Sequence, residues 1–154
     1  MVLHRRSNPD VGASPHSRSW FALLVMEMLK VKRAYDTKEP SDGIRVLVDR
    51  LWPRGLSRAE AGIDDWMKEV APSDELRRWF GHQPEKWTEF RQRYAEELRS
   101  PAKVKLVGKL TRLASDGKVT LVYAARDTEH NNARVLEEII VEQTKGAVQV
   151  LSDK

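Results

Sequence analysis

The chain contains no cysteine among its 154 residues. This absence excludes disulfide bonds, thiolate metal ligands and cysteine nucleophiles, and it fits a reducing compartment. Long apolar runs are also missing: the longest, residues 20–26, is far shorter than the roughly 20 residues that a membrane-spanning helix needs. The sequence therefore predicts a cytoplasmic protein that does not cross a membrane.

Several short motifs of common enzyme classes are absent as well. The chain has no GxxxxGK phosphate loop, no GxGxxG dinucleotide turn, no HExxH zinc motif and no GxSxG nucleophile elbow. Of its four histidines, two lie within the first 16 residues, and His82 is interpreted as a helix cap. We therefore expect neither a metal ion nor a cofactor.

What the chain does contain is charge of both signs. Hydrophobic residues make up 40% of the sequence and charged residues 32%, which leaves enough apolar material for one core. The net charge is +4 and the pI about 9.4. A mild basic excess of this kind suits anionic ligands or weak contact with nucleic acid.

Two parts of the chain differ in composition. Residues 1–27 are largely polar, rich in serine and proline, and without periodicity, so we expect a disordered N-terminal extension. A translation start at Met26 or Met28 would place this extension outside the native protein. Residues 28–154 carry regular patterns and are expected to form a single α/β domain.

The regular patterns predict strands alternating with helices. Residues 29–36 alternate as an edge strand does, whereas residues 43–52 and 119–125 are nearly continuously apolar, as in central strands. A further short strand is expected at residues 145–151. Caps and apolar spacing predict helices over residues 57–61, 64–70, 73–80, 83–100, 100–113 and 133–144. Ser57 and Glu60 are expected to form a capping box at the first of these helices, and Ser73 and Gly81 to begin and end the third. This order predicts a small, mostly parallel sheet of about three or four strands flanked by helices.

Polar segments follow the two central strands. The first ends in "DRLWPRG" (residues 49–55) and the second in "AARDTEHNN" (residues 124–132). Open parallel sheets bind ligands beyond the carboxyl ends of their strands, so these segments predict one shared cleft. The expected ligand-binding residues are Arg50, Trp52, Arg54, Arg126, His130 and Asn131. The candidates for acid–base chemistry are Asp49, Asp127 and His130, and the pattern leaves open whether any reaction occurs.

The predicted ligand is a small anionic or phosphate-bearing molecule. Arginine and histidine side chains bind such groups, and the last long helix would add free amides. We expect Asp127 or Thr128 to cap that helix.

Two other roles fit the same charges. Asp49 could pair with Arg126, and Asp127 with Arg50, to fix loops in a structural or partner-binding protein. Alternatively, the chain could bind nucleic acid weakly through one basic helix, although no recognition-helix motif is present. The basic residues of that helix are Lys103, Lys105, Lys109 and Arg112. No pattern indicates an oligomeric state.

Three segments carry a family resemblance: "GIRVLVDRLWPRGLS", "WFGHQPEKWTEFRQRYAEEL" and "VTLVYAARDTEHNNARVL". They resemble the signatures of the YeaO-like bacterial proteins, in domain-of-unknown-function family 488, and the match runs from about Leu29 to Ile140. The resemblance implies a compact cytosolic α/β domain of Rossmann-like general shape, without an established activity. Other branches of the family carry cysteines, so no thiol chemistry is transferred to this chain.

Overall fold

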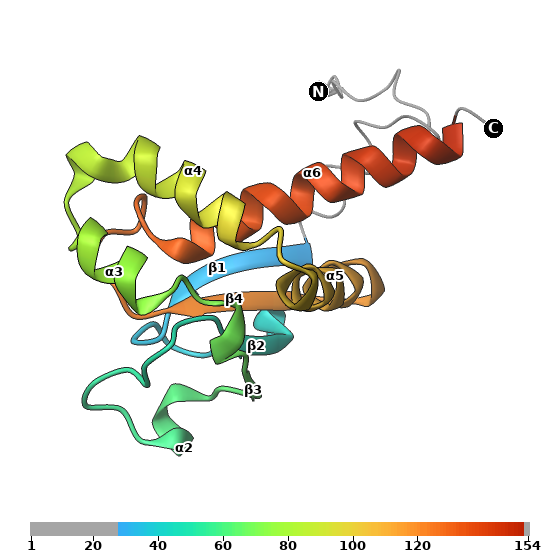
Figure 1. Cartoon of the computed structure of the whole chain (residues 1–154). Coiled ribbons are helices and arrows are strands. Elements are labelled where there is room, and N and C mark those ends of the chain that lie inside the picture. The colour runs from blue at the N-terminus through green and yellow to red at the C-terminus, as the bar shows by residue number, and fades with distance from the viewer. Residues whose placement is uncertain (1–27, 153–154) are drawn as a thin grey trace, which may run out of the picture.

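The computed structural model describes residues 28–152, so the expectations for residues 1–27 lie outside the described residues. Four strands form one sheet in the order β1-β4-β2-β3, and all neighbouring strands are parallel. The strands are β1 (Leu29–Arg33), β2 (Ile44–Leu47), β3 (Asp65–Trp66) and β4 (Val119–Tyr123). This arrangement confirms the α/β class with a small parallel sheet (Figure 1).

The two central strands are the ones with the most apolar sequences. All five residues of β4 are buried, as are the last three of β2. The two strands pair directly, with Leu47 opposite Val122. β1 lies at an edge of the sheet, and its residues after Leu29 are only half-buried, as their alternation predicted. The polar segments after β2 and β4 therefore leave the sheet side by side.

Four helices cover one face of the sheet. They are α3 (Asp74–Phe80), α4 (Trp87–Glu97), α5 (Pro101–Asp116) and α6 (Asn132–Ser152). Their apolar sides pack against strand residues such as Val46 and Leu121 to form the main core. The predicted ends of α3 are confirmed: the Ser73 hydroxyl accepts a hydrogen bond from the Leu76 amide at 3.1 Å, and Gly81 closes the helix. Within residues 28–152, no helix combines the length and hydrophobicity needed to cross a lipid bilayer.

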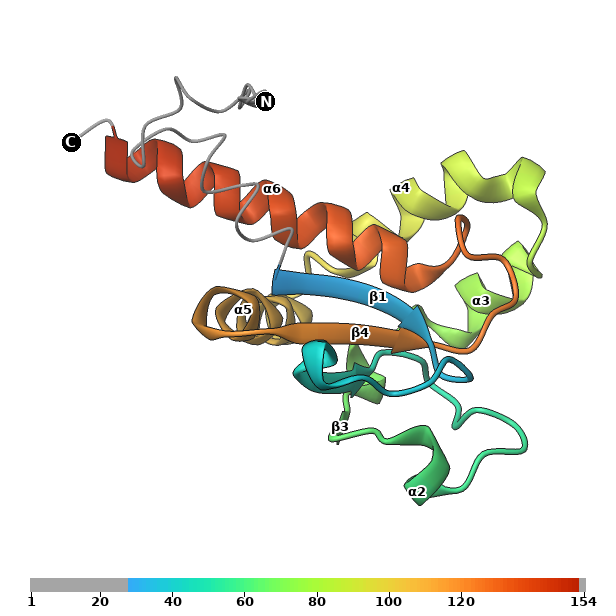
Figure 2. The ribbon, with the colours of Figure 1, turned by 180° about the vertical axis from the view of Figure 1, so that it is seen from behind.

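The opposite face of the sheet is covered by loops and the short helix α2 (Arg58–Ala61). A second, smaller core forms there from Ala34, Leu47, Val122, Trp52, Leu56, Ile63 and Trp66. The predicted capping box of α2 is present, with reciprocal hydrogen bonds of 3.1 and 2.9 Å between Ser57 and Glu60. In both views α2 and α6 lie on opposite sides of the sheet (Figures 1 and 2).

Two of the predicted elements are wrong. The helix expected at residues 64–70 is instead β3 followed by a 3-10 turn, Lys68–Val70. Asp64 accepts a hydrogen bond from the Arg45 amide at 2.9 Å, which ties this segment to the edge of β2. The strand expected at residues 145–151 belongs to α6, which continues to Ser152. A helix already nucleated gains a hydrogen bond with each added residue, and an interior glycine such as Gly146 costs only about 1 kcal/mol.

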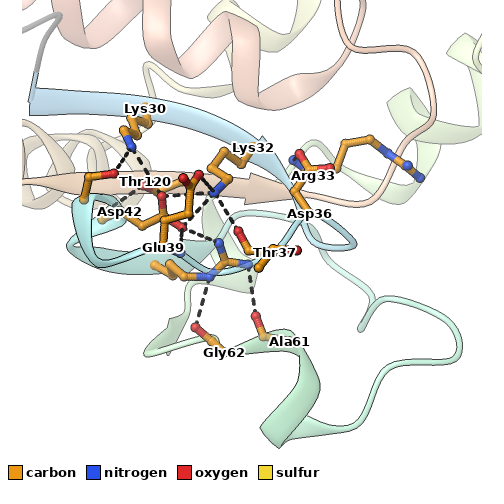
Figure 3. Close-up of polar contacts among 12 residues, drawn as sticks. Lys30, Lys32, Arg33, Asp36, Thr37, Glu39, Asp42, Ala61, Gly62 and Thr120 are labelled. Atoms are coloured by element: carbon orange, nitrogen blue, oxygen red, sulfur yellow. Dashed lines mark hydrogen bonds and ion pairs between the residues drawn. The ribbon is translucent and has the colours of Figure 1, made fainter.

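A group of charged side chains lies between the sheet and the loop that joins β1 to β2. Figure 3 shows four members of this buried charge cluster, Lys30, Lys32, Glu39 and Asp42. The fifth member is Arg45, which pairs with Asp42. Asp42 and Arg45 have an exposed fraction of 0% and pair at 2.8 Å. Lys30 and Lys32 also reach the Asp42 carboxylate, at 3.4 and 3.0 Å. On the face of the sheet opposite the four long helices, this cluster, and not a helix, covers the amino-terminal half.

Each side-chain nitrogen of Arg45 and each carboxylate oxygen of Asp42 has at least one hydrogen-bond partner. Arg45 also donates to the carbonyl oxygens of Gly62 and Ala61, at 3.1 and 3.0 Å. Burial alone would raise the pKa of Asp42, but hydrogen bonds from the Glu39 amide, Lys32 and Arg45 outweigh it and lower the pKa to about 2. Buried charges are tolerated when they are saturated in this way.

Candidate functional site

A cleft of about 700 Å³ opens beyond the carboxyl ends of β2 and β4. Residues 49–54 after β2, and residues 124–127 and 130–132 after β4, form two of its walls. A third wall comes from residues around α3, namely Ala71, Pro72, Arg77, Phe80 and His82. The arrowheads of β1 and β4 point toward the loops that surround this region (Figure 2).

The structure brings together every residue that the sequence assigned to the site. Asp49, Arg50, Trp52, Arg54, Arg126, Asp127, His130 and Asn131 all line the cleft. They meet because β2 and β4 are parallel neighbours, so both polar segments start at the same edge of the sheet. Ligand binding and catalysis by these residues stay predictions.

The ion pairs that would have explained these charges structurally are not formed. Asp49 accepts a hydrogen bond from the Ala124 amide at 2.9 Å, and Asp127 contacts His130. Arg54 and Arg126 are exposed and line the cleft. Across residues 28–152, neither guanidinium group has a hydrogen-bond or ion-pair partner. Two cations therefore face the cleft without a protein anion.

Arg50 is held more firmly than these two arginines. Its Nε donates to the Pro72 carbonyl at 3.4 Å, and its guanidinium lies 4.0 Å from Glu69 and 3.9 Å from Asp74. Both carboxylates are exposed and both distances are long, so these pairs are weak. They orient Arg50 along the wall of the cleft and leave most of its charge available.

The loop that carries Arg54 is closed by its own hydrogen bonds. Trp52 Nε1 donates to the Leu56 carbonyl at 2.7 Å, and the Tyr35 hydroxyl donates to the Arg54 carbonyl at 2.8 Å. Gly55 has a φ of 81°, which the tight turn requires. The backbone of Arg54 is therefore fixed while its side chain is left free.

Asp49 lies in the lining and has a raised pKa. Burial raises the pKa of its carboxyl group to about 6, although hydrogen bonds from Ala124 and Asn132 and the charges of His82 and Arg77 oppose this rise. The side-chain NH₂ group of Asn132 also donates to the Val48 carbonyl at 2.9 Å. An NH₂ group has two hydrogens, so it can donate to both Val48 and Asp49. A carboxyl group that titrates near pH 6 can exchange a proton near neutral pH.

Tyr94 lies behind this carboxyl group and is fully buried. Its hydroxyl donates to the Val70 carbonyl at 2.7 Å. Burial, together with the nearby charge of Asp49, raises the pKa of Tyr94 well above its ordinary value, so the phenol stays neutral. Tyr94 lies outside the lining, and its ring packs against Phe90, which lines the cleft, with centroids 5.7 Å apart.

Asp127 and His130 form a local pair after β4. Asp127 Oδ2 lies 2.8 Å from His130 Nδ1, and Oδ1 accepts hydrogen bonds from the amides of Glu129 and His130. The hydrogen bond with the His130 side chain is the main cause that lowers the pKa of Asp127. The His130 ring also packs edge-on against Trp87, with centroids 5.2 Å apart. These contacts fix the orientation of the imidazole in the wall.

The predicted cap of the last helix is wrong. α6 begins at Asn132, and the Asn131 side chain accepts a hydrogen bond from the Arg134 amide at 3.1 Å. Asp127 closes its own tight turn instead, and the Asn131 side chain donates to its carbonyl at 3.0 Å. His130 therefore lies in the loop before the helix and not in its first turn.

The third wall of the cleft was not predicted. Arg77 and Phe80 belong to α3, and His82 follows it with an exceptional φ of 57°. The prediction that His82 caps the next helix is wrong, since no side chain caps the 3-10 turn at residues 84–86 or α4. Helical periodicity locates α3 but gives no sign that its end returns to the sheet. A positive φ at a histidine has no signature in the sequence.

The lining contains charged and titratable side chains but few of the usual nucleophiles. It contains no serine, threonine, cysteine or lysine. Among the residues that the structure describes, no three histidine or acidic side chains gather as a metal site would require. Arginine side chains are of the kind that binds anions, and Asp49 and His130 are of the kinds that transfer protons.

The basic residues suggested for nucleic-acid binding lie on α5, away from the cleft. Two of the four contact the protein: Lys103 donates to the Glu69 carbonyl, and Lys109 lies 3.9 Å from Asp65. These contacts reduce the charge that this helix face presents. Nucleic-acid binding stays a prediction that the geometry does not favour.

Comparison with known proteins agrees with the resemblance seen in the sequence. Residues 28–152 match the family described as the inactive DUF488-N3 subclade. The chain is 43% identical over 109 residues to the uncharacterised protein YeaO of Escherichia coli (strain K12), a match that covers 70% of this chain and 92% of YeaO. It is 42% identical over 112 residues to the uncharacterised protein Rv3073c of Mycobacterium tuberculosis (strain ATCC 25618 / H37Rv), covering 73% and 92%. No solved structure matches. The chain therefore belongs to the DUF488 family and is YeaO-like.

Proposed function

We propose that this YeaO-like protein binds a small anionic molecule in the cleft beyond β2 and β4. The observation that carries the proposal is the pair Arg54 and Arg126, whose guanidinium groups line the cleft without a partner among the described residues. A guanidinium group presents a planar set of donors that matches the oxygens of a carboxylate or phosphate. A ligand anion would supply the acceptors that the protein does not.

The balance of charge around the cleft supports the same ligand class. Four arginines line it, against two carboxylates. They are Arg50, Arg54, Arg77 and Arg126, facing Asp49 and Asp127. The formal charge of these six side chains alone is 4 − 2 = +2, with both carboxylates ionised and before any contribution from histidine. Glu69 and Asp74, outside the lining, lie within 4.0 Å of Arg50 or Arg77. Among the described residues, Arg54 and Arg126 are therefore the lining arginines without a carboxylate at ion-pair distance. A concave surface of one sign concentrates ligands of the other.

The proposal is for binding without a reaction. The lining lacks the serine, threonine, cysteine and lysine side chains that usually act as nucleophiles. The family description includes the word inactive, which agrees with a site that holds a molecule and leaves it unchanged. In this account Asp127 orients His130, and Asp49 holds the segment after β4 through the Ala124 amide.

Titration calorimetry with inorganic phosphate, methyl phosphate and acetate tests the proposal. At least one anion should bind the wild-type protein and raise its melting temperature. Arg126→Ala should weaken that binding by roughly 10- to 100-fold, because a hydrogen bond to a charged group is worth about 1.5–3 kcal/mol. Arg54→Ala should act in the same direction.

Arg78→Ala is the matched control. Arg78 is exposed on α3, lies outside the cleft, and its loss changes the net charge by the same amount. It should leave affinity within about twofold of wild type, as expected for a distant screened charge. Equal binding by Arg126→Ala and wild type, or no binding of any of the three anions, would show that the proposal is wrong.

A further inference from the structure

The cleft has an apolar part as well as a charged part. Phe80 and Phe90 stack on each other with ring centroids 4.4 Å apart, and both are at least nine-tenths buried. Both nevertheless contribute to the lining, together with Trp52, Leu51 and Pro53. The buried rings form an aromatic floor, while the unpartnered arginines are exposed at the edge.

Exposed hydrophobic side chains also gather at this cleft. Within the described residues, the large hydrophobic side chains that face solvent are Tyr35 (42% exposed), Ile44 (41%), Leu51 (60%) and Val104 (49%). Tyr35 and Leu51 line the cleft. Leu51 sits between Arg50 and Trp52, whose side chains donate hydrogen bonds to the carbonyl oxygens of Pro72 and Leu56. Single exposed apolar residues are common, but two at the mouth of an aromatic-floored cleft indicate a contact surface.

An inorganic anion would leave this apolar surface unused. It would satisfy the arginines, yet Leu51, Tyr35 and the exposed part of Trp52 would stay in contact with water, an arrangement that costs free energy in proportion to the apolar area. The cleft volume of about 700 Å³ lies within the roughly 300–1,000 Å³ typical of sites for organic molecules. Both observations point to a ligand with an apolar body.

We infer that the anion of this cleft is a ring-bearing organic anion, of the class that includes aryl phosphates and aromatic carboxylates. The inference rests on the proposed function: the charged group binds at Arg54 and Arg126. The ring covers Leu51 and the aromatic floor. Aromatic side chains favour stacked or edge-on contact with a second ring, so a planar body fits this wall better than a flexible one.

Matched pairs of probes test the inference by calorimetry. Methyl phosphate and phenyl phosphate carry the same charged group, and acetate and benzoate form a second pair. The aromatic member of at least one pair should bind roughly tenfold or more tightly than its methyl counterpart, from the apolar area that the ring removes from water. The pair with the greater affinity identifies the charged group as phosphate or carboxylate.

Two matched variants connect this gain to the cleft. Leu51→Asn should weaken binding of the tighter aromatic probe by roughly three- to tenfold while leaving binding of its methyl counterpart unchanged. Val104→Asn makes the same change at an exposed position on α5, outside the cleft, and should leave both affinities unchanged. Leu51 is mostly exposed, so its replacement should not impair folding, and thermal unfolding without ligand checks this.

The outcomes separate the inference from the proposed function. If methyl and aromatic probes bind equally, and Arg126→Ala weakens both, the inference is wrong and anion binding stands. If aromatic probes bind but Arg126→Ala has no effect, the proposed function is wrong, and the inference fails with it. If no probe binds, both are wrong. Loss of aromatic selectivity in Leu51→Asn alone supports both.

Discussion

Arginine and aspartate side chains occur both in the buried charge cluster and in the cleft, but their exposure and pairing differ between the two regions. In the buried charge cluster, Asp42 and Arg45 are sealed from solvent, and each side-chain nitrogen of Arg45 donates a hydrogen bond. In the cleft, Arg54 and Arg126 are exposed, and neither guanidinium group has a partner within residues 28–152. Arg45 and Asp49 are only four residues apart, about 13 Å along a strand. One short stretch of chain thus carries Arg45, whose charge is buried in the fold, and Asp49 and Arg54, which line the cleft.

The two regions contain the same residue types and differ in how completely their charged groups are hydrogen-bonded. The cluster can exclude water because the Asp42 carboxylate meets three cations and a backbone amide. The cleft arginines stay hydrated, since nothing within residues 28–152 compensates their charge. An arginine–aspartate pattern in a sequence therefore does not distinguish a structural pair from a binding site. Completeness of the hydrogen bonding does.

The largest expected effect is the removal of Asp42. Asp42→Ala leaves the buried Arg45 guanidinium without its carboxylate, and loss of one partner of a buried pair costs about 3–5 kcal/mol. We expect a decrease of that size in the free energy of unfolding, measured by urea denaturation at neutral pH. A decrease below about 1 kcal/mol would contradict the structural role of the cluster.

An exposed pair provides the control for this experiment. Asp74 pairs with Arg77 at 3.3 Å, and both side chains are more than 40% exposed. Asp74→Ala should cost less than about 1 kcal/mol, because solvent screens such a pair.

Gly43 and Gly55 allow the backbone of the same two regions to be compared by the cost of adding a Cβ atom. Gly43, beside Asp42, has φ 64° and ψ −136°, and a Cβ there would overlap the Lys118 carbonyl oxygen. Gly55, in the cleft loop, has φ 81° with no atom within 4 Å of an added Cβ. Gly43→Ala should lower the free energy of unfolding by about 3 kcal/mol or more, and Gly55→Ala by about 1 kcal/mol. Equal losses in urea denaturation would remove this contrast.

Two aspartates should give opposite pH dependences of stability. The pKa of Asp42 falls from 3.8 to about 2, so between these values the unfolded chain holds the proton and stability rises with pH. The pKa of Asp49 rises from 3.8 to about 6, so between these values the folded chain holds the proton and stability falls as pH rises. We expect changes of about 1–2 kcal/mol in each window after solvent screening.

Urea denaturation from pH 2 to 7 measures both slopes. Asp42→Asn should flatten the slope between about pH 2 and 4, and Asp49→Asn should flatten it between about pH 4 and 6. Differences in slope between wild type and variant that have the same sign for Asp42→Asn and Asp49→Asn would contradict the contrast between the regions.

The position of the cleft at the carboxyl ends of the central strands could be predicted because the sequence patterns that indicate it are local. Apolar runs marked β2 and β4, and the polar residues after each run marked where the strands leave the core. Parallel pairing then placed Asp49 and Arg126 at one edge. The capping pair Ser57 and Glu60 was equally local and is confirmed.

The features that were missed depend on contacts between distant segments. Arg45 interrupts an apolar strand in the sequence, and two of its three partners, the carbonyl groups of Ala61 and Gly62, come from 16 and 17 residues further along the chain. Likewise, periodicity cannot show that Phe80 at the end of α3 reaches the carboxyl end of β4. The α6 cap was assigned to the wrong residue because Asp127, Thr128 and Asn131 all have side chains that can cap.

The hydrogen bonds of Trp52 and Tyr35 have a consequence for the speed of binding. They close the loop around Arg54 before any molecule arrives, so a ligand does not have to order that backbone. Association should then be governed by diffusion and charge attraction, with a rate that falls as ionic strength rises. Differences in affinity between ligands should appear mainly in how long each stays bound.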